Sequence, residues 1–503
     1  MIATSVAVIA TWARLVRIIG QASVSVARAS ARQGSAADPL PASIVGVVIF
    51  LALPQFRAAS GSIDLTWQGA ERKPILSQRT GPHAGDSRNR KNKRMTRGVA
   101  IVGTGHGGVQ AAASLREEGF EGPVVLVGEE KELPYHKPPL SKTFIKDDAA
   151  APQILRAESF YDGQDIKLRL GQRVTRLDGR RLEFEDGSAL DFDHVILALG
   201  SRPRRLALPG LELAGVLTLR DVADARKIRE AARTADDVVI LGGGFIGLEI
   251  AATLRAGGRR VTVIEAQPRI LGRAVAPPIA GHVRQRLEDS GVRIVTGATV
   301  ERLEGDAGRV AAAVLSSGQR IPAGLVIVGV GAVPNVELAE AAGIETANGI
   351  RVDGGMRSSA DGVLAIGDCA NYRHWMTGED TRLESVQNAT DQGRLAAKTI
   401  LGHDGAYDSV PWFWSDIGDM KLQMVGLVGR EDRHVVVGRP EENRFSVFHF
   451  AGPRLTAIES VNRPADHMLG RRILTTEFSP DIEMLKANPD GLKAAFQEWQ
   501  AGR

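Results

Sequence analysis

Cysteine is almost missing from this sequence: Cys369 is the only one among 503 residues. A single thiol forms no internal disulfide, which excludes a secreted disulfide scaffold and any enzyme that needs a redox-active cysteine pair. The ten histidines include no H-x-x-H or H-E-x-x-H pattern, so the sequence predicts no bound metal. Long apolar runs are missing too. The best, Ile44–Leu53, is far shorter than the roughly 20 residues of a membrane span, and none is predicted.

The net charge of +4 is distributed unevenly along the chain. Residues 1–94 hold 13 Lys and Arg against 4 Asp and Glu, a local charge of +9. Residues 95–503 hold the remaining 50 basic and 55 acidic side chains, a net charge of −5. Because the excess of basic residues is confined to the N-terminal segment, the charge gives no reason to expect nucleic-acid binding by the rest of the chain.

Residues 1–94 differ in composition from the rest of the chain, and a short apolar strand, Val99–Val102, begins just after Met95. Two interpretations are open. Residues 1–34 contain four arginines and no acid, as a mitochondrial transit peptide does; alternatively, the start was assigned too far upstream and the working protein begins at Met95. We favour the second, since the apolar run at 44–53 suits neither a transit peptide nor a signal sequence. We therefore exclude 1–94 from the fold and expect a cytoplasmic protein.

Apolar strands alternate with helical patterns along the body of the chain. Strands predicted at Val99–Val102 and Val124–Val127 flank one helical pattern, and the series recurs at Val238–Leu241 and Val261–Ile264. This alternation predicts parallel α/β sheets covered on both faces, in two related nucleotide-binding domains.

The last hundred residues change character, because apolar segments separated by turns there predict antiparallel strands. The segments are Leu422–Val428, His434–Val437, Phe445–Phe450 and Leu455–Val461, followed by a short helix near Ala465–Ile473. The predicted fold class is therefore α/β, with two Rossmann-like dinucleotide-binding domains and a C-terminal α+β domain.

The first helical pattern is preceded by a loop that fits G-x-G-x-x-G at Gly103, Gly105 and Gly108. The first glycine allows the tight turn, the second lets a pyrophosphate approach the backbone, and the third lets helix and strand pack closely. Glu129 ends the next predicted strand, where an acid binds ribose hydroxyls. A glycine-rich turn without a ligand is the alternative, but strand, loop, helix, strand and acid are all in register here.

A second loop repeats the pattern at Gly242, Gly244 and Gly247, with Glu265 at the end of the following strand. Two such loops predict two dinucleotides, for which a flavin and a nicotinamide are the economical pair. The acid favours NAD over NADP because it would repel a 2′-phosphate. Three arginines nearby weaken this preference unless they are solvated surface charges: Arg259, Arg260 and Arg269.

Asp368 supports the flavin half of this hypothesis. It follows the apolar strand Val363–Ile366 and precedes a helical stretch at 387–400, a place from which a carboxylate can accept hydrogen bonds from ribityl hydroxyls. Alone, Gly367-Asp368 would be a common turn.

With these features in place, the chain from Met95 to about Leu474 resembles the FAD-dependent, NADH-using ferredoxin reductases. These reductases serve bacterial Rieske-type dioxygenases and haem-thiolate monooxygenases, within the glutathione-reductase fold group. The segments that carry the resemblance are LPYHKPPLSK at 133–142, GLE at 247–249, AIGD at 365–368, ESVQNA at 384–389 and PWFWSD at 411–416.

The resemblance implies a division into domains. An FAD-binding domain would be built from 95–208 and 330–408, with an NAD-binding domain inserted at 209–329. Residues 409–503 would form a C-terminal reductase domain that packs at the flavin face.

The resemblance also implies roles for two charged residues. Lys142 would lie near the flavin N5 edge, with Glu249 beside it to help hold the nicotinamide. A cation near the ring favours negative charge on the reduced flavin, and a fixed pair orients the hydride donor. Taken alone, Glu249 is equally an acid near a helix start that complements the macrodipole.

Further flavin contacts are implied by the same resemblance. Arg202 falls where the family has a flavin-contacting arginine, and Lys137 stands where arginine usually neutralises the FAD phosphate, so its contact should be less directional. Trp414 would be a flavin-face residue near the electron exit, although tryptophans in a proline-bounded segment are by default core aromatics. Ile417-Gly418 replaces the more usual Gln-Tyr, in a region expected to border the flavin and the partner surface.

The lack of a cysteine pair determines how electrons would leave the flavin. Dithiol reductases of this fold carry a cysteine pair, so here the electrons must leave the flavin directly. We expect NADH to reduce FAD, and FAD to pass electrons singly to a [2Fe–2S] ferredoxin that feeds an oxygenase. Other acceptors on the same scaffold remain open: rubredoxin, a quinone, oxygen or a redox-signalling role. A non-catalytic flavin-binding protein is a further alternative.

Overall fold

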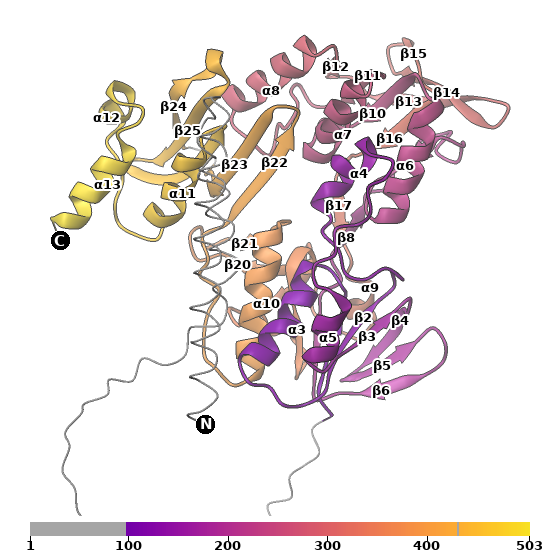
Figure 1. The fold of residues 1–503 in the computed structure, drawn as a ribbon, viewed down its shortest axis with the longest axis vertical. Helices are drawn as coiled ribbons and strands as arrows, with labels where there is room; N and C mark the ends of the chain where they lie inside the picture. The colour runs from indigo at the N-terminus through magenta and orange to yellow at the C-terminus, as the bar shows by residue number, and fades with distance from the viewer. Residues whose placement is uncertain (1–96, 430–431, 503) are drawn as a thin grey trace, which may run out of the picture. The chain divides into compact units, whose positions relative to one another are not determined.

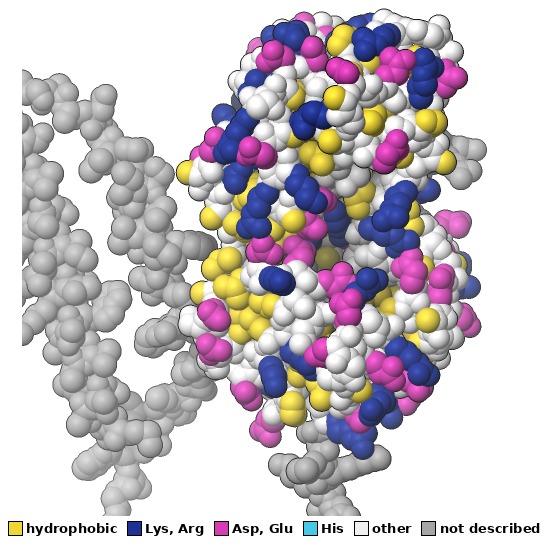
Figure 2. All heavy atoms as spheres, turned by 90° about the vertical axis from the view of Figure 1, so that its right-hand side faces the viewer, with side chains coloured by type: hydrophobic (Ala, Val, Ile, Leu, Met, Phe, Trp, Pro, Cys, Tyr) yellow, Lys and Arg dark blue, Asp and Glu magenta, His cyan; other side chains and the backbone are white. Residues whose placement is uncertain are grey.

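The computed structural model of the chain describes residues 97–429 and 432–502 (Figure 1). The N-terminal extension and both interpretations of it lie outside these residues. No helix within the described ranges is long and apolar enough to cross a membrane. On the face shown in Figure 2, Lys and Arg side chains are interspersed with Asp and Glu.

The first sheet has five strands whose pairings are all parallel. In spatial order they are β19 (Val363–Ala365), β7 (His194–Leu197), β1 (Val99–Val102), β2 (Val124–Gly128) and β3 (Ile166–Leu170). Every residue of β1 and β2 is buried because layers cover both faces of the sheet. Since β19 pairs with β7, chain from beyond the second glycine loop completes the first sheet.

Helices cover one face of this sheet and strands cover the other. The helices are α3 (His106–Glu117), α5 (Glu158–Gly163) and α10 (Val386–Ile400). Helices α3 and α10 lie side by side (Figure 1), with Gly393 placed against the backbone of Gly107. The opposite layer consists of α9 (Glu337–Ala341) and antiparallel β4 (Val174–Asp178), β5 (Arg181–Phe184) and β6 (Ala189–Asp191). The predicted two-sided cover is therefore present, with a β-layer on one side.

The second sheet repeats this architecture. Its parallel strands, in spatial order, are β12 (Arg293–Thr296), β11 (Arg260–Glu265), β10 (Asp237–Leu241), β16 (Leu325–Val328) and β9 (Val216–Leu217). Its helices are α6 (Val222–Thr234), α7 (Phe245–Ala256) and α8 (Pro277–Asp289). Its strand layer is β13 (Val300–Asp306), β14 (Arg309–Leu315) and β15 (Arg320–Pro322).

Small pairings join these units. Strands β8 (Ser201–Pro203) and β17 (Ala332–Pro334) pair antiparallel where the chain leaves the first sheet and returns to it. A further three-stranded sheet consists of β18 (Ile350–Val352), β20 (Ala370–Arg373) and β21 (Asp380–Thr381). The predicted division into an FAD-binding domain and an inserted NAD-binding domain, with boundaries at 208/209 and 329/330, stays a prediction.

The C-terminal sheet is antiparallel throughout. In spatial order it contains β22 (Trp412–Ile417), β23 (Met420–Gly426), β26 (Arg454–Val461), β25 (Arg444–Ala451) and β24 (Arg433–Arg439). Three helices pack on one face: α11 (Pro464–Ile473), α12 (Ile482–Ala487) and α13 (Leu492–Ala501). The other face shares a buried core with α7 and α8. The four predicted strands and the short helix are present, whereas β22, α12 and α13 were not predicted.

Candidate active site

The first glycine loop joins β1 to α3, and its three positions are occupied by glycine for different physical reasons. Gly103 has a φ of 122°, a conformation that favours glycine, and a Cβ there would collide with the carbonyl oxygen of Ala198. A Cβ at Gly108 would collide with the carbonyl oxygen of Gly103. At Gly105 a Cβ would meet no protein atom within 4 Å. Packing therefore explains the first and third glycines, while the second leaves its backbone open to a ligand, as a pyrophosphate requires.

The second loop, between β10 and α7, shows the same division. Gly242 has a φ of 108° and lies against the carbonyl oxygen of Gly329. Gly247 lies against the carbonyl oxygen of Gly242, and Gly244 is again free of protein contacts within 4 Å. Both loops thus present one open glycine at the start of a helix, where backbone N–H groups and the helix dipole favour an anion.

Glu265 ends β11 beside this second loop. Its Oε2 accepts a hydrogen bond from the backbone N–H of Gly243 at 2.7 Å, and its Oε1 accepts one from Gln267 at 2.7 Å. The carboxylate is therefore fixed against the loop, at the carboxyl edge of the second sheet where dinucleotides bind.

Two consecutive acids come directly after β2. The predicted ribose-binding acid, Glu129, is the first of them, but its side chain is 69% exposed and pairs with Arg173. Glu130 faces inward instead: it accepts hydrogen bonds from the hydroxyl of Tyr135 and, at 2.9 Å, from Nζ of Lys137. Burial and the bond to Glu130 raise the pKa of Tyr135, so its hydroxyl stays protonated and can donate. Glu130 was not predicted, although its position one residue past Glu129 could have suggested it.

A cavity of about 250 Å³ lies between the two glycine loops and the C-terminal sheet. Six of the predicted residues line it: Gly105, Lys137, Lys142, Glu249, Asp368 and Trp414. The lining residues that were not predicted include three charged or ionisable side chains, two aromatic rings and a hydroxyl: His106, Arg220, Glu384, Phe245, Phe413 and Ser141. The cavity thus collects side chains from segments far apart in the sequence.

Lys142 and Glu249 form an ion pair inside this cavity, with Nζ 2.8 Å from Oε1. Lys142 stands between the short helices η1 (Pro138–Ser141) and α4 (Thr143–Lys146), and its Nζ also donates to the carbonyl oxygen of Pro138 at 3.1 Å. Glu249 lies on α7 and is only 6% exposed. Ser141 Oγ donates to its Oε2 at 2.5 Å, and Ser415 Oγ donates to its Oε1 at 2.6 Å. Both carboxylate oxygens therefore have donors.

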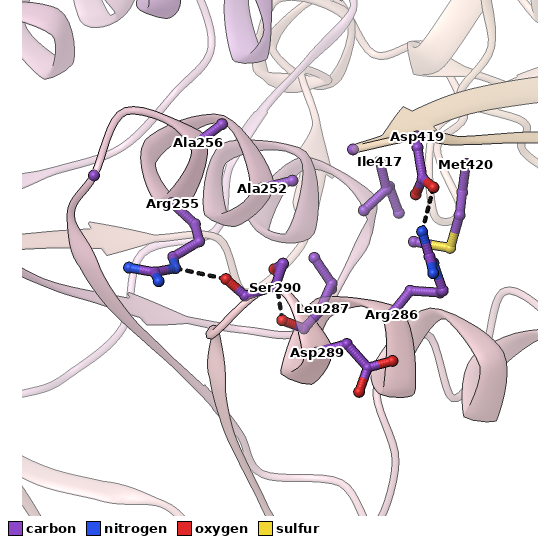
Figure 3. Close-up of a pocket in the computed structure, with 12 residues that line it drawn as sticks. Ala252, Arg255, Ala256, Arg286, Leu287, Asp289, Ser290, Ile417, Asp419 and Met420 are labelled. Carbon is purple, nitrogen blue, oxygen red and sulfur yellow. Dashed lines mark hydrogen bonds and ion pairs between the residues drawn. The ribbon is translucent and has the colours of Figure 1, made fainter.

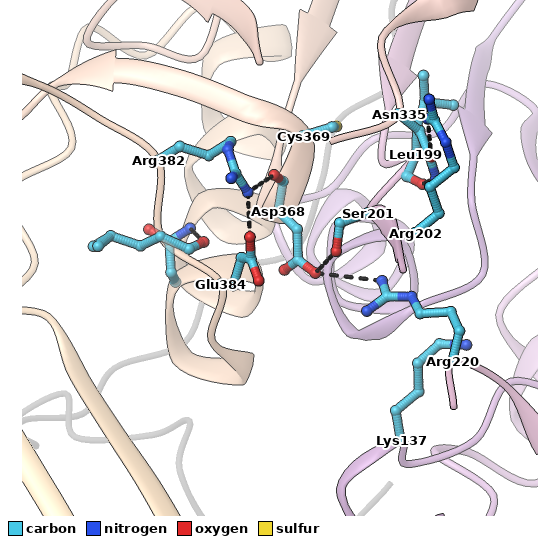
Figure 4. Close-up of polar contacts among 12 residues, drawn as sticks. Lys137, Leu199, Ser201, Arg202, Arg220, Asn335, Asp368, Cys369, Arg382 and Glu384 are labelled. Carbon is cyan, nitrogen blue, oxygen red and sulfur yellow. Dashed lines mark hydrogen bonds and ion pairs between the residues drawn. The ribbon is translucent and has the colours of Figure 1, made fainter. Parts of the chain in front are cut away.

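Asp368 lies in the turn η2 (Gly367–Cys369) after β19. Its Oδ2 accepts a hydrogen bond from Ser201 Oγ at 3.0 Å and lies 3.3 Å from the guanidinium of Arg220 (Figure 4). Arg202, the expected flavin contact, does not line the cavity. Its guanidinium pairs with Glu337 and lies beside Asn335, away from Asp368 (Figure 4). The geometry therefore gives Arg220, not Arg202, as the arginine of this cavity.

Comparisons with known proteins agree with this geometry. Residues 97–393 match the family described as pyridine nucleotide-disulphide oxidoreductase, and residues 412–496 match a reductase C-terminal family. The chain belongs to the pyridine nucleotide-disulphide oxidoreductase family. The predicted fold class and the resemblance to ferredoxin reductases are thereby confirmed.

Individual members of the family extend the match over almost their whole length. The chain is 42% identical over 401 residues to rhodocoxin reductase from Rhodococcus erythropolis, covering 79% of this chain and 94% of that protein. It is 41% identical over 369 residues to rubredoxin–NAD(+) reductase from Pseudomonas putida, covering 73% and 96%. The crystal structure of a ferredoxin reductase from Rhodopseudomonas palustris superposes with a TM-score of 0.77 at 42% identity, covering 80% and 100%. The chain is thus an oxidoreductase of the ferredoxin reductase type.

Membership of this family implies FAD and a nicotinamide dinucleotide, and the residues fit both. Gly105 and Gly244 are the two glycines whose backbone is open to a ligand, each at a helix N-terminus. Asp368 and Lys137 line the cavity beside the first loop, where a carboxylate suits hydroxyl groups and an ammonium suits phosphate. Glu265 stands beside the second loop, where a carboxylate suits ribose hydroxyls.

The family's name refers to disulphide chemistry, which Cys369 does not offer. Its side chain is fully buried, and Sγ donates to the carbonyl oxygen of Ile366 at 3.3 Å. Burial raises the pKa of the thiol to about 11, which keeps it protonated and unreactive. Cys369 is therefore a small buried residue of the core.

His106 is a cavity residue from the variable part of the first loop. Its Nε2 lies 3.2 Å from Nδ1 of His136, so one ring must donate to the other. Burial, and then the charges of His136 and Lys137, lower the pKa of His106 to about 4. The imidazole is therefore neutral at pH 7 and adds no positive charge to the cavity.

A second cavity lies at the turn between β22 and β23, against α7 and α8 (Figure 3). Ile417 and Gly418 line this second cavity and not the first, so their departure from the family pattern falls elsewhere than expected. The charged side chains that line this second cavity form ion pairs or hydrogen bonds with other groups of the protein. Arg286 pairs with Asp419, and Arg255 Nε donates to a backbone carbonyl at 2.7 Å (Figure 3).

Proposed function

We propose that this protein oxidises NADH and passes the electrons singly to a [2Fe–2S] ferredoxin that feeds an oxygenase. The observation that carries the proposal is the ion pair between the half-buried Lys142 and the buried Glu249, in a cavity flanked by two open dinucleotide loops. The only thiol, Cys369, is buried and protonated, which leaves no side chain to relay electrons as a dithiol.

FAD, when bound, supplies the chemistry that couples a two-electron hydride donor to one-electron acceptors. We assign its pyrophosphate to the loop at Gly105, its ribityl chain to Asp368 and its ring to the cavity bounded by Lys142 and Trp414. In this arrangement the Lys142 ammonium lowers the free energy of negative charge on the ring, and Glu249 fixes that ammonium in place. Arg220 holds Asp368 from the side of the second sheet.

The preference for NADH over NADPH rests on Glu265 and on the positions of its neighbouring arginines. Arg260 begins β11, at the opposite end from Glu265, and pairs with Asp237 at 2.7 Å. Arg269 donates to two backbone carbonyls, at 2.8 Å each. Neither guanidinium is directed by its contacts toward a 2′-phosphate, and the carboxylate would repel one.

The [2Fe–2S] acceptor is favoured by direct electron transfer from the cavity, whose lining residue Trp414 lies beside Trp412, their ring centroids 5.6 Å apart. Rubredoxin is the second candidate, because a relative at 41% identity is named for it. Quinones and oxygen are further acceptors to be tested.

The test uses the full-length chain loaded with FAD. NADH-driven cytochrome c reduction is followed with an added [2Fe–2S] ferredoxin, with rubredoxin and with neither, and oxygen uptake is recorded in parallel. Strong dependence on ferredoxin with little oxygen uptake supports the proposal, whereas equal or greater dependence on rubredoxin moves the function to the second candidate. Lys142→Gln should slow flavin reduction. Lys146→Gln, an exposed lysine on α4, serves as the matched control. A flavin that NADH fails to reduce overturns the dehydrogenase assignment.

A further inference from the structure

Glu249 is held by hydroxyl groups from two other parts of the fold. Ser141 follows the first sheet's β2 in the chain, and Ser415 lies on the edge strand β22 of the C-terminal sheet, while Glu249 belongs to a helix of the second sheet. Both hydroxyls are buried: Ser141 is 4% exposed and Ser415 is 0% exposed. A carboxylate removed from water needs such donors, since an unpaired buried charge costs several kcal/mol.

The position of Ser415 within its strand makes it unusual. Alternate residues of β22 face α7, and they read Phe413, Ser415 and Ile417. The ring centroids of Phe413 and Phe245 lie 4.8 Å apart, and Ile417 is fully buried in the core that α7 shares with the C-terminal sheet. Ser415 is thus the polar residue in an otherwise apolar contact between strand and helix, directly opposite Glu249.

A purely structural role would be served as well or better by an apolar pair at this position. Replacing a buried polar or ionic contact by well-packed apolar side chains is often neutral or stabilising. The hydrogen bond from Ser415 instead leaves Oε1 of Glu249 shared between a hydroxyl at 2.6 Å and the Lys142 ammonium at 2.8 Å. With Ser141 on Oε2, the carboxylate is fixed at both oxygens.

We propose that Ser415 and Ser141 are positioning residues that orient the Glu249 carboxylate, so that the C-terminal domain completes the nicotinamide half of the active site. The proposal rests on the proposed function, because it assumes that Glu249 helps to hold the nicotinamide. Loss of either hydroxyl lets the carboxylate rotate and lets the Lys142 ammonium shift toward its other acceptor, the carbonyl of Pro138. Nicotinamide binding and hydride transfer then weaken, while release of electrons to an acceptor is unaffected.

The experiment compares Ser415→Ala and Ser141→Ala with Ser446→Ala in the full-length, FAD-loaded protein. Ser446 is the matched control because it is a fully buried serine of the same C-terminal sheet, and its Oγ donates to a carboxylate, that of Asp466, at 2.7 Å. Three quantities are measured. They are the rate of flavin reduction by NADH in anaerobic rapid mixing, the affinity for the non-reducing analogue tetrahydro-NADH by calorimetry, and the rate at which ferricyanide reoxidises photoreduced protein.

We expect each variant at the Glu249 contacts to slow flavin reduction about tenfold, the loss of about one hydrogen bond to a charged group. Analogue affinity should fall severalfold, reoxidation by ferricyanide should be unchanged, and Ser446→Ala should change none of the three. Unchanged reduction and analogue binding in both variants overturn the proposal, as does an equal loss in the Ser446 variant. Glu249→Gln distinguishes failure of this proposal from failure of the proposed function. If this variant leaves reduction by NADH unchanged, the role assigned to Glu249 in the proposed function fails instead.

Discussion

His467 offers a test of how burial controls charge in the C-terminal domain. It lies on α11 at 1% exposure, edge-on to Trp412 with 5.6 Å between ring centroids, and its buried Nδ1 has no hydrogen-bond partner. Burial, and then the charge of Arg471, lower the pKa of His467 to about 4 from its usual 6.5. The folded protein therefore holds this ring neutral over a pH range in which the unfolded chain protonates it.

The sign and size of the effect come from linkage. Between pH 6.5 and pH 4 the unfolded state binds more protons, so the stability contributed by the neutral ring is present above this range and is lost as the pH falls through it. A pKa difference of about 2.5 corresponds to about 3 kcal/mol in full, of which about 2 kcal/mol is lost by pH 5. That loss is a large fraction of the stability of an ordinary domain.

The perturbation is His467→Phe, which keeps an aromatic ring against Trp412 and removes the titration. Free energies of unfolding are measured by urea titration at pH 7 and at pH 5, with tryptophan fluorescence as the probe. We expect the wild-type protein to lose about 2 kcal/mol more than the variant between these two pH values. His403→Phe, at an exposed position, controls for the loss of a surface imidazole. Parallel losses in the wild-type protein and the His467 variant would refute the reasoning.

Three further predictions concern the cofactor sites. Arg220→Ala should weaken FAD binding to the apoprotein about tenfold, since it removes the partner of a cavity carboxylate, whereas Arg202→Ala should leave the affinity unchanged. Both affinities are measured by fluorescence titration with FAD, and a larger loss in the Arg202 variant than in the Arg220 variant contradicts the assignment. Gly105→Ala should leave the melting temperature of the apoprotein unchanged but impair FAD retention, because the added Cβ meets only open space. Gly108→Ala should lower the melting temperature, because its Cβ collides with the backbone. Identical melting curves for the two variants count against this interpretation. Glu265→Gln should reduce the preference for NADH over NADPH about tenfold in the ratio of kcat/KM values, and an unchanged ratio means that specificity lies elsewhere.

Much of the fold could be predicted because its signals are local. Four-residue apolar strands followed by glycine loops predict parallel sheets, since a strand buried on both faces carries no alternation. The edge strand β22 was missed because tryptophans in a proline-bounded segment are by default core aromatics, which does not indicate a strand. The helices α12 and α13 come after the last predicted element and have no counterpart in the prediction.

Individual site residues divide along the same line. The glycines of both loops could be located from the sequence alone, because a tight turn and a close helix approach constrain consecutive residues of one segment. Contacts that cross between sheets could not be located in this way, and the Lys142–Glu249 pair was expected only from the resemblance to the family. Nothing local indicates that Ser415 meets Glu249 or that Arg220 and not Arg202 faces Asp368. Such pairings depend on how the sheets and their helices pack against one another. The physical reason is that a side chain's partner is set by distances in space, which the order of residues along one segment does not contain.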